Sequence, residues 1–521
     1  MACKFFLHKG KNKKAEQGRP WIYIDEINEY DGDYENGDIV EVYNHKNYFI
    51  GKGYINDRSK ITIRIMTRDI NEEIDEDFFK RRFAAAWDYR KTVIDTSSCR
   101  FIFGEADFLP GLTVDKFEDY YVIQISTLGM EKYRDLIVKI LVEEYGAKGV
   151  YERSDIKTRE IEGLVQTKGF LTEPFDTNVE IIENGVKYIV DLENGQKTGF
   201  FLDQKENRAA MHRICKGKDV LDCFTHTGSF ALNAGIAGAK SVLGIDVSQH
   251  AVDCATRNAK LNNLQDTVKF ECHNAFNVLG DWSREGRQYD VVILDPPAFT
   301  KSRNTINAAI RGYKEINLRG LKMVKPGGYF ATCSCSHYMN EEQLKKTVLE
   351  AAHDARRTLR QVEIRTQSSD HPFFQSMFDN TRTGNADIDD GIRLGYAVES
   401  ACHERVVVRC IAENNEFCAS KAVVLFACLR RLLNDLTHQF DSIHVDTGFG
   451  GAKVDGTADK IRNSQCLRDR TDQKLICCRH TFAYQSGIAA EEIDADFFCR
   501  TVQSLCNRHE ILRRSAGCCA D

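Results

Sequence analysis

The sequence predicts an α/β protein whose central part is a doubly wound, mainly parallel sheet. From about residue 178, short apolar runs alternate with helical patterns, as expected for parallel strands joined by crossover helices. The first 75 residues instead alternate apolar and polar positions between glycines, which is typical of a small β-barrel. Two of the later apolar runs end in an acid and in thiols. Because ligands of such sheets bind beyond the carboxyl ends of the strands, these side chains are expected to share one cleft.

The expected elements divide the chain into four parts. Strands at 38–43, 48–55 and 61–66 define a small β domain (1–75), and a helix at 77–93 and a strand-rich segment at 99–172 define an α+β middle domain (76–175). In the α/β domain (176–375) we expect strands at 219–223, 241–245, 268–271, 291–294 and 328–331, with helices at 250–261, 307–321 and 341–357. Residues 376–521 form the fourth part.

Length, charge and hydropathy limit the classes of protein. A chain of 521 residues has room for three or four domains. No apolar run approaches the roughly 18 residues of a membrane span, and the N-terminus lacks the apolar core of a signal peptide. We therefore expect a cytoplasmic protein with reduced thiols. The formal net charge of −6 excludes a global basic field, although Lys9, Lys11, Lys13, Lys14 and Arg19 form a local basic cluster.

The last part of the chain has a different composition. It contains eleven of the 19 cysteines but no proline or tryptophan. Two interpretations stay open, an out-of-frame translation product and a genuine extra domain. Within this part, 405–411 is an apolar run that could close the sheet of the preceding domain.

The segment 222–230 is a candidate cofactor loop. It joins a strand to a helix start, and Gly228 permits close approach of a ligand to the backbone. The next strand ends at Asp246, where an acid can accept both hydroxyls of a ribose. Alternatively, Asp246 could be the N-terminal cap of the following helix. Asn274 after the third strand could read an adenine edge or could be a simple turn residue.

Asp295, Cys333 and Cys335 form a candidate catalytic group. A thiolate that adds to C6 of a pyrimidine makes C5 nucleophilic, and an acid can hold the N3 of the base. Cys335 could be the nucleophile and Asp295 the donor or proton relay. The Cys-x-Cys spacing, without a second pair nearby, argues against zinc. The lack of a G-x-S-x-G elbow argues against serine hydrolysis.

With several further motifs, these residues resemble a known family. It comprises the class I S-adenosylmethionine (SAM)-dependent RNA cytosine-5 methyltransferases of bacterial large-subunit rRNA that carry an N-terminal PUA domain. The resemblance covers residues 1 to about 375. It is carried by motifs at 18–21, 37–38, 51–53, 105–115, 196–204, 222–230, 295–299, 311–317 and 334–336.

The resemblance implies a Rossmann-like methyltransferase domain, SAM as cofactor and a cytosine of 23S rRNA as substrate. It favours Cys335 over Cys333 as the nucleophile, and it implies that 198–204 closes over SAM. The expected cofactor-binding residues are Thr198, Gln204, Asp222, Phe224, Thr225, Gly228, Asp246, Asn274, Ala275 and Asp295. The expected RNA-binding residues are Lys9, Arg19, Lys52 and Lys314, and a homodimer is an expected assembly.

Two other functions remain open from the sequence. One is a methyltransferase with the same cofactor that acts on another substrate, such as uracil C5 or a small molecule. The other is an RNA-binding or ribosome-assembly protein whose catalysis is impaired by the aberrant tail. The thiol at 335 favours C5 chemistry, and the PUA-like segment favours RNA.

Overall fold

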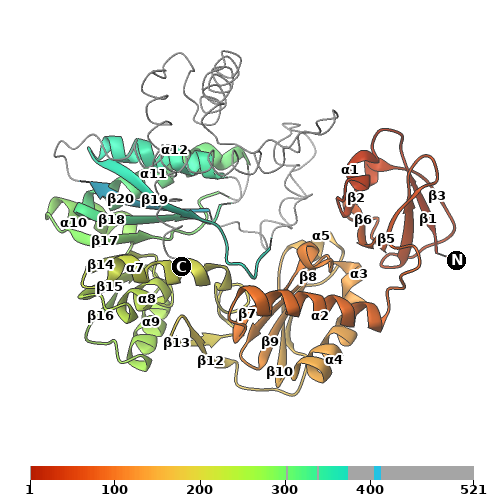
Figure 1. Ribbon diagram of the computed structural model, residues 1–521, viewed down its shortest axis with the longest axis horizontal. Helices are drawn as coiled ribbons and strands as arrows, with labels where there is room; N and C mark the ends of the chain where they lie inside the picture. The colour runs from red at the N-terminus through yellow and green to blue at the C-terminus, as the bar shows by residue number, and fades with distance from the viewer. Residues whose placement is uncertain (1, 301–302, 337–338, 373–403, 412–521) are drawn as a thin grey trace, which may run out of the picture. The chain divides into compact units, whose positions relative to one another are not determined.

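The computed structural model describes residues 2–300, 303–336, 339–372 and 404–411. Within these ranges the strands form four sheets of six, five, two and seven strands (Figure 1). Apart from β20, the expectations for 376–521 lie outside the described residues.

The first sheet is built from the N-terminal segment in the order β2-β6-β5-β4-β1-β3. Its elements are β1 (Lys4–Leu7), α1 (Lys13–Glu16), β2 (Trp21–Tyr23), η1 (Ile24–Glu26), β3 (Ile27–Asp31), β4 (Ile39–Tyr43), β5 (Phe49–Ile55) and β6 (Ile61–Thr67). Gly53 lies where β5 and β6 approach closely, because a Cβ there would stand 1.8 Å from the carbonyl oxygen of Arg64. The three strands expected in this segment are confirmed within two residues at each end.

The second sheet forms the middle of the chain, with strand order β11-β10-β9-β8-β7. Its strands are β7 (Ser98–Phe103), β8 (Leu112–Phe117), β9 (Tyr120–Ile125), β10 (Gly149–Ser154) and β11 (Thr167–Phe170). The accompanying helices are α2 (Glu76–Val93), η2 (Gly104–Asp107), α3 (Leu128–Glu131), α4 (Arg134–Tyr145) and α5 (Thr158–Ile161). Aromatic and aliphatic side chains of α2, α4 and this sheet share one buried core.

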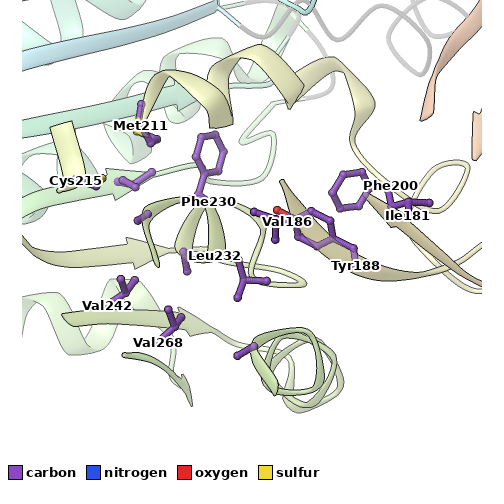
Figure 2. Packing of buried hydrophobic residues seen from close by; sticks show 14 of the residues in the cluster. Ile181, Val186, Tyr188, Phe200, Met211, Cys215, Phe230, Leu232, Val242 and Val268 are labelled. Carbon is purple, nitrogen blue, oxygen red and sulfur yellow. The ribbon is translucent and has the colours of Figure 1, made fainter. Parts of the chain in front are cut away.

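A two-stranded hairpin, β12 (Asn178–Glu183) and β13 (Val186–Asp191), precedes the α/β pattern. The sequence interpretation missed it. Its signal was Asn184-Gly185, which adopts positive φ angles of 54° and 79°, as a tight hairpin turn requires. Tyr188 of this hairpin packs against Phe200 with ring centroids 5.0 Å apart, as Figure 2 shows.

The seven-stranded sheet has the order β16-β15-β14-β17-β18-β20-β19. Its strands are β14 (Asp219–Cys223), β15 (Ser241–Asp246), β16 (Val268–Cys272), β17 (Tyr289–Leu294), β18 (Val324–Ser334), β19 (Thr358–Arg365) and β20 (Glu404–Ile411). The first five are parallel, whereas β20 runs antiparallel to both β18 and β19. The expected doubly wound sheet is therefore confirmed, and β20 occupies the position proposed for 405–411.

Helices cover both faces of this sheet. They are η3 (Leu202–Gln204), α6 (Lys205–Ala210), α7 (His212–Cys215), α8 (Ser229–Ile236), α9 (Gln249–Leu261), α10 (Ala275–Arg284), η4 (Arg303–Thr305), α11 (Ile306–Met323) and α12 (Glu341–Asp354). Helices α8 and α9 pack on β14, β15 and β16, whereas α11 packs on β17 and β18 beside α10 and α12 (Figure 1). On the first of these faces, Phe230 and Leu232 of α8 join Val242 and Val268 of the sheet in one core (Figure 2).

Candidate active site

The loop between β14 and α8 has an unusual backbone. Phe224, His226 and Gly228 adopt positive φ angles of 64°, 50° and 86°. Gly228 is the N-cap of α8, and a Cβ at this position would lie 2.7 Å from the Phe270 ring. Such conformations cost energy in non-glycine residues and concentrate at ligand-binding sites. The loop therefore presents its backbone at the end of the sheet where the sequence predicts a cofactor.

Asp222 lies at the root of this loop, and its side chain is completely buried. Its Oδ2 accepts hydrogen bonds from Thr225 Oγ1 at 2.6 Å and from the amide of Ala231 at 3.0 Å. Its Oδ1 has no hydrogen-bond partner within the part of the chain that the structure describes. Burial, opposed by the Thr225 hydrogen bond and reinforced by the negative charge of Asp295, raises the pKa of Asp222 to about 7. A buried oxygen in this state fits a bound polar ligand.

Asp246 is the last residue of β15, and its side chain is hydrogen-bonded to the same loop. Its Oδ2 accepts a hydrogen bond from the amide of His226 at 3.0 Å, and its Oδ1 accepts one from the amide of Ser248 at 3.0 Å. The N-cap of α9 is Ser248, whose hydroxyl accepts from the amide of Ala251. Asp246 is therefore not the cap of that helix, and its carboxylate lies beside the candidate cofactor loop.

Asn274 and Ala275 have mainly structural contacts. Asn274 is the N-cap of α10, and its Oδ1 accepts a hydrogen bond from the amide of Phe276 at 2.9 Å. This is the capping geometry expected of a turn residue. Ala275 is buried in the core between the sheet and α10. Phe276 lies 6.2 Å from the Phe224 ring of the cofactor loop, measured between ring centroids.

Asp295 and Cys335 follow two adjacent parallel strands. Leu294, the last residue of β17, is in register with Thr332 of β18. The side chain of Cys335 is partly exposed, and its Sγ lies 3.5 Å from the carbonyl oxygen of Pro296, next to Asp295. Cys333 lies inside β18 and is 3% exposed. The structure thus brings Asp295 and Cys335 to the same sheet edge and separates the two thiols by burial.

The two ends of the segment expected to close over SAM have different neighbours. Gln204 is buried, and its Nε2 donates to Asp295 Oδ2 at 3.3 Å. Thr198 donates from Oγ1 to Asp115 Oδ2 at 2.5 Å, and Asp115 is itself paired with Arg100 in the middle sheet. Gln204 is therefore hydrogen-bonded to the candidate catalytic acid, whereas Thr198 fixes the other end of the segment 198–204 to β8.

Sequence reasoning missed Tyr313. It is a fully buried residue of α11, and its hydroxyl lies 3.0 Å from Ser334 Oγ and 2.9 Å from Ser336 Oγ. These serines flank Cys335. The signal available was the segment 311–317, which carried part of the family resemblance without a role for its tyrosine.

The four expected RNA-binding residues differ in exposure and in their partners. Arg19 is 4% exposed and pairs with Glu26, and Lys52 is 6% exposed and donates to the carbonyl oxygen of Glu72 at 3.2 Å. Neither side chain offers an open positive charge, because both are held within the N-terminal segment. Lys314 Nζ lies 2.9 Å from Asp354 Oδ2 on α12. Lys9 is exposed, as a phosphate contact would require.

Within the described ranges, we find no group of three His, Cys, Asp or Glu side chains arranged to hold a metal ion. No helix among the described residues is both long and apolar enough to cross a membrane.

Comparison with known proteins defines the class. Residues 5–68 match the PUA-like domain family, and residues 166–372 match the S-adenosylmethionine-dependent methyltransferase family. Two solved structures share the fold at 19% identity and cover 78% of this chain and all of their own. One is a SAM-dependent methyltransferase from Streptococcus mutans, with a TM-score of 0.61, and the other a methyltransferase complexed with SAH, with a TM-score of 0.62. The chain is a SAM-dependent methyltransferase with an N-terminal PUA-like domain.

Curated relatives define the family more narrowly. Ribosomal RNA large subunit methyltransferase I of Aliivibrio fischeri (strain MJ11) is 42% identical over 379 residues, which are 71% of this chain and 95% of the relative. The protein of the same name from Shewanella frigidimarina is 41% identical over 378 residues, with the same coverage. The chain belongs to the ribosomal RNA large subunit methyltransferase I family, as the sequence resemblance predicted.

Proposed function

We propose that this enzyme transfers a methyl group from SAM to C5 of a cytosine in large-subunit ribosomal RNA, through a covalent bond between Cys335 and C6 of the base. The observation that carries the proposal is the placement of Cys335 and Asp295 at the ends of adjacent parallel strands, with the partly exposed thiol beside Pro296. The family name supports ribosomal RNA as the substrate, and the thiol supports carbon rather than nitrogen as the methylated atom.

The residues around the β14–α8 loop fit the cofactor. The backbone at Phe224, Thr225 and Gly228 and the buried Oδ1 of Asp222 suit the amino acid part of SAM, while Asp246 suits the ribose hydroxyls. Phe276 and the helix start at 274–275 would flank the adenine. Thr198 and Gln204 frame the segment that leads to Asp295. Bound SAM supplies the electrophilic methyl group.

The chain's own residues would activate the base. The Cys335 thiolate adds to C6, and the electron pair of the C5–C6 double bond moves through C4 to N3; when this pair returns, C5 acts as the nucleophile. In its protonated form Asp295 donates a hydrogen bond to N3 and stabilises the negative charge that develops there, while Gln204 orients the Asp295 carboxyl group. After C5 has bonded to the methyl group, water takes the C5 proton and the bond between C6 and the Cys335 sulfur breaks, which restores the C5–C6 double bond and releases the thiolate.

The RNA-binding residues, the cellular location, the domain boundaries and the assembly are further parts of the proposal. Lys9 is the expected phosphate contact in the PUA-like domain, and release of Lys314 from Asp354 would let it reach RNA. A ribosomal substrate supports a cytoplasmic site of activity. The boundaries at residues 75, 175 and 375 and a homodimer remain proposals, which limited proteolysis and sedimentation equilibrium test.

The test of the proposed reaction is nucleoside mass spectrometry. Purified protein is incubated with methyl-labelled SAM and unmodified large-subunit rRNA, and the RNA is digested to nucleosides. The proposal requires label in 5-methylcytidine. Label in a methylated uridine would assign the other pyrimidine, and SAM binding without label in RNA would support a non-catalytic RNA-binding protein.

A further inference from the structure

Three hydroxyl groups surround the backbone of residue 335. Tyr313 is fully buried in α11, and its hydroxyl reaches the turn that follows β18. Ser334 Oγ donates to the Tyr313 hydroxyl at 3.0 Å, and the Tyr313 hydroxyl lies 2.9 Å from Ser336 Oγ. The amide of Ser336 completes the arrangement by donating to Ser334 Oγ at 3.3 Å. Both serines that flank Cys335 are thus tied to the same phenol.

Ser334 donates its hydroxyl proton to the Tyr313 oxygen, whereas either oxygen can be the donor between Tyr313 and Ser336. Burial, reinforced by the negative charge of a Cys335 thiolate, raises the pKa of Tyr313 to about 12. The phenol therefore stays protonated at neutral pH and keeps its donor. Both serines are 1% exposed, so water does not compete for these bonds.

Tyr313 is itself held in place from the neighbouring strand end. Its ring lies 4.4 Å from the ring of Phe299, which ends the segment that begins at Asp295. Its carbonyl oxygen accepts a hydrogen bond from Asn317 Nδ2 at 2.7 Å within α11. One residue therefore contacts the segment after β17 through its ring and the turn after β18 through its hydroxyl. These are the two segments that carry the candidate acid and the candidate thiol.

We propose that Tyr313 is a positioning residue, which acts through Ser334 and Ser336 to fix the Cys335 thiol relative to Asp295. The inference rests on the proposed function, since it concerns the attack of Cys335 on C6. Reactions of this kind are sensitive to small displacements of the reacting group, and a shift of about 1 Å can cost on the order of 100-fold in rate. This role explains why the residues on both sides of Cys335, Ser334 and Ser336, carry hydroxyl groups.

The test measures covalent adduct formation with an RNA that contains 5-fluorocytosine, at saturating RNA and SAM. Tyr313→Phe removes the hydroxyl and keeps the ring. We expect a rate of adduct formation at least about 10-fold below that of the wild type, with SAM and RNA affinities within about twofold. Ser336→Ala, which leaves α11 untouched, should give a similar loss. Because the groups act as one network, the double variant should lose no more than the worse single variant.

Tyr54→Phe is the matched control. Its hydroxyl is also buried and hydrogen-bonded, to the carbonyl oxygen of Pro110 and to Thr127. The ring of Tyr54, however, belongs to the core formed by α2, α4 and the second sheet. This variant should be less stable and react at the wild-type rate. Wild-type rates for both Tyr313→Phe and Ser336→Ala, or losses that multiply in the double variant, would overturn the positioning role. Absence of any adduct with the wild-type protein would instead contradict the proposed reaction.

Discussion

A single carboxyl group, that of Asp222, shows how the cofactor loop is prepared for a ligand. The loop leaves one oxygen of this buried group without a partner among the described residues, although burial of an ionised carboxylate is costly. Its raised pKa means that the folded protein holds this proton more tightly than the unfolded chain does. A ligand with a positive charge or donors at Oδ1 would reverse that preference. The strained backbone from Phe224 to Gly228 serves the same purpose, because it holds amide groups in place before the ligand arrives.

The stability of the SAM-free enzyme should depend on Asp222. Because its pKa rises from 3.8 in the unfolded chain to about 7 in the folded one, its favourable contribution is complete below pH 4 and is lost as the pH rises through 7. Asp222→Asn keeps an acceptor for Thr225 and removes the charge. Thermal unfolding between pH 5 and pH 8 should therefore show a smaller decrease in Tm for Asp222→Asn than for the wild type. Parallel curves would show that the carboxyl group titrates as in the unfolded chain.

Asp246→Ala should weaken SAM binding by about 1.5–3 kcal/mol, the usual contribution of hydrogen bonds to a charged group. The carboxylate also accepts from the amide of His226, so its loss loosens the loop as well. Isothermal titration calorimetry gives the affinity directly. Asp266→Ala, at an exposed position between α9 and β16, is the control and should bind SAM like the wild type. Equal affinities for both variants would remove Asp246 from the site.

At the scale of elements, the segment 366–372 links the helical turn that carries Gln204 to the second sheet. The amide of Ser368 donates to the carbonyl oxygen of Asp203 at 2.8 Å, beside Gln204. On its other side, Asp370 accepts from the amide of Arg100 at 2.8 Å, and its carbonyl oxygen accepts from Arg90 at 2.9 Å. The segment thereby fixes the short helices that carry Gln204 against strand β7 and helix α2.

Arg90→Met should destabilise the protein by about 3–5 kcal/mol, because it leaves a buried carboxylate without its partner. Arg90 is fully buried and donates to Asp107 Oδ2 at 2.7 Å in addition to its bond with Asp370. Urea denaturation measures the free energy of unfolding. The exposed ion pair of Arg284 with Asp281 offers a control, and Arg284→Met should cost less than about 1 kcal/mol. An equal loss in the free energy of unfolding for the two variants would show that burial does not increase the contribution of the Arg90–Asp107 pair.

The elements differ in how far the sequence predicts them. Strands β14, β15 and β17 are predicted because buried parallel strands are continuous apolar runs. Strand β19 is not, since a register shift between Gln361 and Glu363 breaks the alternation of its apolar residues. The sequence also predicts which strand ends carry Asp246, Asp295 and Cys335. It cannot reveal the hydroxyl network of Tyr313, because that depends on the packing of α11 against β18.

At the scale of the whole molecule, the N-terminal domain is joined to the middle sheet by buried polar contacts. Trp21 Nε1 donates to Glu105 Oε1 at 2.9 Å, and Arg64 Nη2 donates to Glu162 Oε1 at 2.8 Å. Deletion of the N-terminal domain would leave Glu105 and Glu162 without their partners. Substitution of surface lysines is therefore the better probe of the role of this domain in RNA binding. The net charge of −6 makes local lysines, rather than a global field, responsible for phosphate contacts.

The exposed lysines Lys9 and Lys13 should contribute phosphate contacts. The double substitution Lys9→Gln and Lys13→Gln should lower the magnitude of the slope of log K against log salt concentration by about 1.4–1.8, because each neutralised phosphate accounts for roughly 0.7–0.9 of that slope. Fluorescence anisotropy on an rRNA fragment measures the slope. Lys11, which is paired with Asp25, is the internal control, and Lys11→Gln should change the slope less. An unchanged slope in the double variant would exclude this end of the domain from the RNA interface.

The proposed mechanism depends most on the assignment of Cys335 as the nucleophile, and one experiment tests this assignment directly. RNA that carries 5-fluorocytosine traps the covalent adduct, because fluorine cannot leave C5 as a proton does. Peptide mapping of the trapped protein should locate the crosslink at the partly exposed Cys335. Cys335→Ala should abolish both the adduct and methyl transfer, whereas the buried Cys333→Ala should retain substantial activity. A crosslink at Cys333, or none at either thiol, would contradict the account.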